Sequence, residues 1–102
     1  MIEYNKLVRD KIPEIITQGG MKAITHIADE KEYEEALYQK LGEEVKEFQE
    51  KPSAEELADI LEVVYAICDW KKIDRDELEK LRQEKAEKRG GFSKRIILEK
   101  TE

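Results

Sequence analysis

Apolar residues recur at helical spacing through a long stretch in the first half of the chain. Asp29 followed by Glu32 is typical of a capping box, which predicts a helix that begins there and continues to about Glu50. Four apolar residues, three or four positions apart, form one stripe along this helix: Leu37, Leu41, Val45 and Phe48. At about 100° per residue they share one face, so we expect that face to pack against another element.

A second long helix is predicted after a turn at Pro52. Ser53 followed by Glu56 predicts its start, and the charges of Lys71 and Lys72 suit its C-terminus. Its apolar residues cover most of the circumference: Leu57, Ile60, Leu61, Val63, Val64, Ile67 and Cys68. Its polar face consists of Glu55, Glu62 and Asp69. With so short a turn, the two long helices are expected to run antiparallel.

The wide apolar surface of the second helix predicts that the chain associates with itself. A helix that is apolar on nearly every side needs neighbours on nearly every side. The chain offers few other helices to cover Val63, Ile67 and Trp70, so we expect a second copy to cover them. A two-fold dimer is the commonest symmetric solution, and the prediction is a homo-oligomer, either a dimer or a tetramer.

Shorter helices flank the two long ones. Asp10 is placed to cap a helix over residues 11–18, which Gly19-Gly20 ends. A further helix is predicted from Asp74 to Arg89, and the double glycine that follows terminates it. These helices make the predicted fold class mainly α.

Two short runs are rich in β-branched or aromatic residues and indicate a small two-stranded β element. They cover about residues 22–27 and 92–98, and they are expected to pair with each other. The only histidine, His26, lies in the first run without nearby partners for chemistry, so we expect it on the surface or in the strand.

Length, charge and cysteine content restrict the class of protein. A chain of 102 residues predicts a single domain, residues 1–102, with a modest core. The net charge of −6 argues against nucleic acid or an anionic membrane as the main partner. The stretch 1–9 lacks the apolar run of a signal peptide, and no membrane span is apparent. The single cysteine, Cys68, fits a packing role in a reducing compartment, so a cytoplasmic protein is expected.

Four acidic residues fall on helix surfaces that are expected to be buried. Glu44 lies within the apolar stripe of the first long helix, and Glu47 lies at its edge, while Glu43 points further outward. Glu56 and Asp59 intrude in the same way on the second helix, where three-residue spacing places them on one face. Because buried like charges need compensation, these four carboxylates predict a site for a hard divalent cation, Mg²⁺ or Mn²⁺.

A simpler interpretation of these acids is a solvated acidic surface. Glu-rich helices are common, and Glu56 is also correctly spaced to close a capping box with Ser53. A solvated surface would place its acids opposite the apolar stripe, whereas Glu44 lies within it. The position of Glu44 therefore favours the metal site.

The acid spacing and two other segments together resemble a known family. Glu43-Glu44-x-x-Glu47 followed by Glu56-x-x-Asp59 is similar to the acid motif of the MazG-like nucleotide pyrophosphohydrolases. The opening YNKLVRDKIPEII and the late KRGGF are similar to a small single-domain branch related to phosphoribosyl-ATP pyrophosphohydrolase. The resemblance covers nearly the whole chain, and it implies a helical bundle of MazG-like type.

The resemblance also implies a reaction. It would be metal-dependent hydrolysis of a nucleoside triphosphate between the α and β phosphates, giving the monophosphate and pyrophosphate. The catalytic residues implied by the motif are Glu43, Glu44, Glu47, Glu56 and Asp59. All but Glu43 would bind one or two Mg²⁺ or Mn²⁺ ions, and Glu43 would either support these ligands from outside or position water as a base. Phosphoribosyl-ATP is an alternative substrate. A non-catalytic helical interaction module with a structural cation is the alternative outside enzymes.

Basic residues near both ends of the chain are candidates for substrate binding. A metal-bound triphosphate would still carry charge that Lys6, Arg9, Lys88 and Arg89 are able to balance. For Lys88 and Arg89 the ordinary alternative is a helix C-terminus, where the macrodipole favours cations. The similarity of KRGGF to the family's late basic signature favours a phosphate contact for both.

Overall fold

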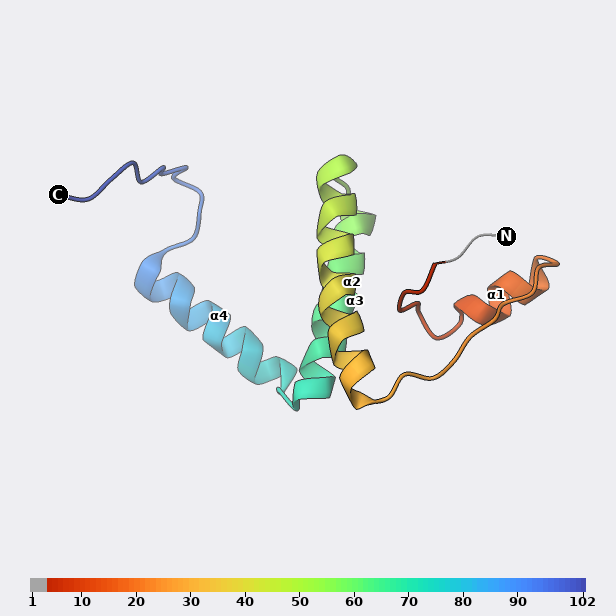
Figure 1. Ribbon diagram of the computed structural model, residues 1–102. Coiled ribbons are helices and arrows are strands. Elements are labelled where there is room, and N and C mark those ends of the chain that lie inside the picture. The colour runs from red at the N-terminus through yellow and green to blue at the C-terminus, as the bar shows by residue number, and fades with distance from the viewer. Residues whose placement is uncertain (1–3) are drawn as a thin grey trace.

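The computed structural model describes residues 4–102, and within them the chain is all α (Figure 1). The helices in chain order are α1 (Ile12–Gln18), α2 (Glu30–Glu50), α3 (Ala54–Lys71) and α4 (Arg75–Arg89). These bounds agree closely with the helices predicted from the sequence. Residues 1–3, part of the opening stretch that lacks an apolar run, lie outside the described residues.

The caps of α2 and α3 are the ones predicted. The Asp29 side chain accepts a hydrogen bond from the backbone N–H of Glu32 at 2.9 Å, and the Ser53 hydroxyl accepts one from Glu56 N–H at 3.2 Å. Only residues 51–53 separate the two helices. Because so short a connection reverses the chain, α2 and α3 run antiparallel and side by side (Figure 1).

The core is small and lies between α2 and α3. Leu37 is 1% exposed, and Val63 and Cys68 are also buried. The predicted polar face of α3 is exposed in full: Glu55, Glu62 and Asp69. The expectation that Val63 needs a second copy is wrong, because α2 already buries it within one chain. Trp70 is partly buried as well, and its ring packs edge-on against Tyr33 of α2 at 5.1 Å between centroids.

The chain leaves α3 through a left-handed residue. Lys72 has φ 59° and ψ 39°, and the N–H groups of Lys72 and Ile73 donate to the carbonyls of Asp69 and Cys68. This pair of bonds is a Schellman motif, which usually has glycine at the left-handed position. Beyond it, α4 points away from the α2–α3 pair (Figure 1), and Leu81 on α4 stays 53% exposed.

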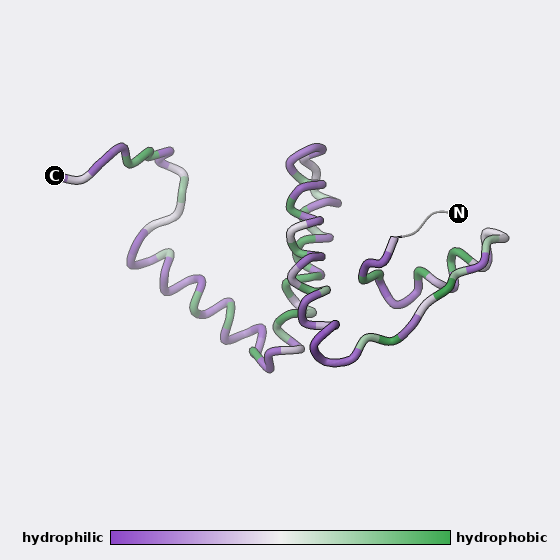
Figure 2. Tube along the Cα trace, in the orientation of Figure 1, coloured by the Kyte–Doolittle hydropathy of each residue, from purple (hydrophilic) through white to green (hydrophobic). Residues whose placement is uncertain are grey.

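The small β element predicted at residues 22–27 and 92–98 is not formed, and residues 4–102 contain no strand. The two runs lie on opposite sides of the α2–α3 pair (Figure 1), so their backbones cannot exchange hydrogen bonds. Apolar positions in both runs are visible in Figure 2 and are exposed, with Ile27 95% and Phe92 97% accessible. A single β-prone run has no edge to join, and propensity alone does not make it a strand.

Helix α1 differs from its prediction only at its start. Asp10 was expected to cap it, but Lys11 occupies the N-cap position and makes no side-chain capping bond. Pro13 lies in the first turn, where its missing N–H costs nothing. The helix ends at Gly19 as predicted, followed by Gly20 with φ 90°.

The described chain is extended rather than globular. Its radius of gyration is 17.9 Å, whereas about 13 Å is typical of a compact domain of this length. The α2–α3 pair is flanked by α1 on one side and α4 on the other (Figure 1). Among residues 4–102, no helix combines the length and the apolar character needed to cross a bilayer.

Candidate metal centre

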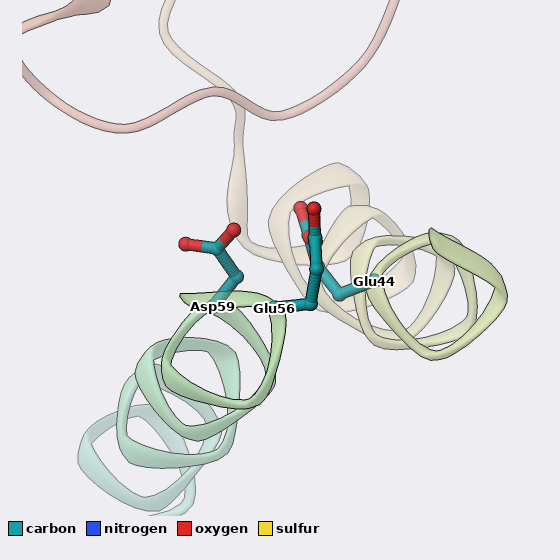
Figure 3. A group of neighbouring side chains, drawn as sticks. All are labelled: Glu44, Glu56 and Asp59. Atoms are coloured by element: carbon teal, nitrogen blue, oxygen red, sulfur yellow. The ribbon is translucent and has the colours of Figure 1, made fainter. Parts of the chain in front are cut away.

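Three carboxylates from two helices converge on one point beside the α2–α3 interface. Glu44 comes from α2, and Glu56 and Asp59 come from successive turns of α3 (Figure 3). One oxygen from each lies within 4.8 Å of the others, a separation that a single cation can bridge. The three-residue spacing of Glu56 and Asp59 and the antiparallel pairing of the helices produce this arrangement.

Two of these carboxylates have a buried oxygen that no hydrogen bond satisfies. Glu44 is only 7% exposed, and its Oε2 has no partner in the described chain; the same holds for Glu56 Oε2. The capping box that would explain Glu56 is only half formed. Ser53 accepts from Glu56 N–H, but the Glu56 carboxylate makes no return bond to Ser53 among the described residues and instead faces Glu44 (Figure 3). A solvated acidic surface does not account for these buried oxygens.

The electrostatics of Glu44 reflect its position. Burial raises the pKa of the Glu44 carboxyl above its ordinary value, and the neighbouring Glu47 carboxylate raises it further. Lys40 acts in the opposite direction on the same pKa. Glu47 is partly buried beside Glu44 but is not one of the three converging ligands. The structure therefore brings together three of the four predicted metal ligands and leaves the fourth next to them.

Lys40 belongs to the site and was missed by the sequence analysis. Its side chain is only 16% exposed, and Nζ lies 3.3 Å from Glu44 Oε1 and 3.6 Å from Glu43 Oε1. A signal for it was present, because Lys40 precedes Glu43 by three residues and Glu44 by four, the spacings that bring side chains together on a helix.

The segment before α1 supplies two further cations. Lys6 Nζ pairs with Glu43 Oε1 at 2.9 Å, and Arg9 Nη2 donates to Asp59 Oδ1 at 2.7 Å. The hydrogen bond from Lys6 holds the pKa of Glu43 below its ordinary value, and that of Lys6 rises correspondingly. Both cations were predicted to lie near substrate. The structure places both at the acid cluster, the group of carboxylates formed by Glu43, Glu44, Glu47, Glu56 and Asp59.

A pocket of about 270 Å³ lies between this segment and the helix pair. It is lined by Lys6, Val8, Arg9, Ile12, Lys40, Glu44 and Asp59. Its walls therefore combine the carboxylates of Glu44 and Asp59 with three cations, two from the segment before α1 and one, Lys40, from α2. Such a mixed lining suits a ligand that carries both metal and phosphate.

The charges around the pocket leave a negative surplus. The five clustered carboxylates are Glu43, Glu44, Glu47, Glu56 and Asp59, and the cations beside them are Lys6, Arg9 and Lys40. Fully ionised, the cluster carries two negative charges in excess, which one divalent cation would balance. Oxygen-only donors without histidine or cysteine suit a hard ion such as Mg²⁺ or Mn²⁺. The residues present thus fit the metal that the sequence predicted.

The other predicted candidates lie elsewhere. Lys88 and Arg89 are exposed at the end of α4, which points away from the acid cluster, so one chain does not bring them to it (Figure 1). His26 is exposed as predicted, and its Nε2 lies 2.9 Å from Glu32 Oε2. Cys68 is buried as predicted, 3% exposed.

Comparisons of this chain with protein families, with curated proteins and with solved structures each found no match.

Proposed function

We propose that this protein is a metal-dependent nucleotide pyrophosphohydrolase that cleaves nucleoside triphosphates between the α and β phosphates. The observation that carries the proposal is the convergence of Glu44, Glu56 and Asp59, two of which have a buried oxygen with no hydrogen-bond partner in the described part of the chain. The resemblance of the acid motif and its flanking segments to MazG-like enzymes supplies the reaction.

The residues divide into two groups by charge. Glu44, Glu56 and Asp59, with Glu47 adjacent, would hold Mg²⁺ or Mn²⁺. When bound, such an ion neutralises phosphate charge and lowers the pKa of a water molecule bound to it. Glu43 lies beside these ligands, paired with Lys6 and Lys40, and in the proposal it positions water through its carboxylate.

The cations of the pocket have a role toward the phosphates. Lys6 and Arg9 reach the cluster from the opposite wall, and Lys40 reaches it from α2. Arginine and lysine bind phosphate oxygens through charge-assisted hydrogen bonds, and arginine does so with two parallel donors. In the proposal these three side chains orient the phosphate chain so that its scissile bond lies next to the carboxylates.

A second copy of the chain would complete the site. A pocket of about 270 Å³ is at the small end for a ligand of nucleotide size, since such sites usually measure about 300–1,000 Å³. We propose a homo-oligomer, in which Lys88 and Arg89 of one copy contact a nucleotide held by another. Their exposure at the end of a projecting helix is consistent with that role.

Product analysis with a nucleotide panel tests the proposal. The panel contains the common and modified nucleoside triphosphates and phosphoribosyl-ATP, each incubated with Mg²⁺ or with EDTA. We expect monophosphate and pyrophosphate in the presence of Mg²⁺ only, and loss of both products in Asp59→Asn. Release of a nucleoside diphosphate and inorganic phosphate would show that the bond between the β and γ phosphates is cleaved instead. Metal binding without turnover of any nucleotide would favour a structural cation in an interaction module.

A further inference from the structure

The segment formed by residues 4–12 is held against the acid cluster chiefly through charge. Its two long-range ion pairs are Lys6 with Glu43 and Arg9 with Asp59. Apolar anchoring is slight, because Leu7, Val8 and Ile12 are only partly buried and α1 beyond them contains no buried residue. In Figure 3 this part of the chain passes over the three carboxylates. A contact of this kind can open and close without disturbing the core.

Arg9 forms an ion pair with Asp59, one of the three converging carboxylates. Its Nη2 donates to Asp59 Oδ1 at 2.7 Å, a full charge-assisted hydrogen bond. A divalent cation held by Asp59 would face the positive guanidinium at close range, and the two repel each other. Arg9 and the metal therefore compete for the same carboxylate.

Arg9 is exposed enough to move away from Asp59 and still lies next to the pocket. Its side chain is 55% exposed and also lines the pocket in which phosphates would lie. A rotation of its long side chain exchanges a carboxylate partner for a phosphate oxygen without loss of charge pairing.

Resting on the function proposed above, we infer that residues 4–12 form a strap that responds to loading of the site. Without metal, Arg9 and Lys6 neutralise Asp59 and Glu43 and hold the strap closed. Metal binding displaces Arg9 from Asp59 and loosens the strap. A triphosphate then recaptures Arg9 and closes the strap over the bound nucleotide. Arg9 thus opposes metal binding and favours nucleotide binding.

Opposite effects of one substitution test this inference. In Arg9→Gln, Mn²⁺ affinity without nucleotide should rise about two- to fivefold, the amount expected for loss of one partly exposed ion pair. Affinity for a non-hydrolysable α,β-methylene triphosphate with Mn²⁺ should fall at least about tenfold. The control Lys11→Gln removes the same charge from an exposed neighbour on the strap and should change neither value appreciably.

Hydrogen exchange of the unmodified chain gives a second measurement that needs no variant. Amides of residues 4–12 should exchange faster when Mn²⁺ is added and slower again when the α,β-methylene triphosphate follows. Unchanged or weaker Mn²⁺ binding in Arg9→Gln, or slower exchange with Mn²⁺ alone, would overturn the strap while leaving the metal site intact. Absence of Mn²⁺ binding to the unmodified chain would overturn the proposed function as well.

Discussion

Glu44 of α2 and Glu56 of α3 face the same point from two antiparallel helices (Figure 3), and the buried Oε2 of each has no hydrogen-bond partner within residues 4–102. Pairing of the two helices buries Leu37 and Val63, and it brings these carboxylates together as a consequence. The hydrophobic contact thus stabilises the pair while the acids oppose it. Functional sites often contain such locally unfavourable groups, which a ligand then stabilises.

Divalent cations are expected to stabilise the fold. Binding to the folded chain alone adds RT ln(1 + [L]/Kd) to the free energy of unfolding, about 2.7 kcal/mol at a hundredfold excess over Kd. Melting temperatures measured during titration with Mg²⁺ and Mn²⁺ should therefore rise. Potassium chloride at matched ionic strength is the control and should produce a much smaller change. A melting temperature unaffected by both divalent ions would argue strongly against the metal site.

Glu44→Gln should stabilise the metal-free protein at neutral pH. The pKa of Glu44 is raised in the folded state, so its stabilising contribution is present below the ordinary value of 4.5 and is lost as pH rises through the raised pKa. The amide of glutamine does not ionise, so the variant does not lose stability as the pH rises. Denaturant unfolding in EDTA should show the variant above the parent at pH 7, with the difference in unfolding free energy shrinking as the pH falls through the raised pKa and largely gone below about 4.5.

The same variant should lose its response to Mg²⁺, since glutamine is a poor substitute for a carboxylate ligand. Glu62→Gln, exposed on α3, is the control and should keep both the pH dependence and the Mg²⁺ response of the parent. A Glu44→Gln protein less stable than the parent at pH 7 in EDTA would show that the ion pair with Lys40 outweighs the cost of burial.

The helices were predictable because local signals and periodicity agreed. Asp29 and Ser53 cap the helices they were expected to cap. The helical periodicity of about 100° per residue placed Glu44 on the buried side correctly. The β element failed because strand formation depends on a partner that local sequence does not specify. The same periodicity defines the faces of α3 but does not show which of them α2 covers. Val63 was therefore expected to pack against a second copy, whereas it is buried within one chain.

The site was predicted only in part, because spacing within one helix places some of its residues and contacts between distant segments place the others. Glu56 and Asp59 share one helix, and their relative placement follows from spacing alone. The contribution of Lys6 and Arg9 depends on how the segment before α1 returns to the α2–α3 pair, which has no periodic signal. Lys40 was overlooked because a lysine one turn before two glutamates is typical of a solvent-exposed helix.

Glu56 and Glu62 lie on the same helix, and substitution is expected to reduce catalysis at Glu56 but not at Glu62. Glu56→Gln keeps the shape and removes the charge from a converging ligand, so Mg²⁺-dependent pyrophosphate release should fall by more than the ~10–100-fold typical of residues that only support a ligand. Glu62→Gln on the exposed face should retain the rate of the parent. Initial rates at saturating Mg²⁺ measure both. Equal losses in the two variants would contradict the assignment of the functional face of α3.

Lys72→Gly should stabilise the fold. A residue other than glycine at φ 59° incurs a steric cost of about 1–2 kcal/mol, partly offset by the greater freedom of glycine in the unfolded chain. A net gain of about 0.5–1 kcal/mol in unfolding free energy is expected from denaturant titration. The matched control is Lys51→Gly, at a C-cap with φ −142°, which should be neutral or slightly destabilising. A stability gain at Lys51 as large as at Lys72 would exclude the steric explanation.

The exposed apolar residues of the helix pair predict self-association. On α3, Leu57 and Leu61 are 51% and 44% exposed, and their four-residue spacing places them on one face. Leu61 lies about 200° around the helix from Asp59, so this face is turned away from the acid cluster. On α2, Tyr38 and Val45 are 48% and 38% exposed and two turns apart on one face. Burial of these side chains by a second copy would recover much of the roughly 1.5–3 kcal/mol that each large apolar side chain contributes.

Light scattering at micromolar concentration should therefore give at least twice the 12.0 kDa mass of one chain. Leu61→Glu should shift the mass toward 12.0 kDa, because a charge on the shared face is costly to bury. Asp69→Asn, on the exposed polar face of the same helix, should leave the assembly unchanged. A parent protein of 12.0 kDa in solution would refute the oligomer, and the exposed face of Leu57 and Leu61 would then be solvated in the free protein.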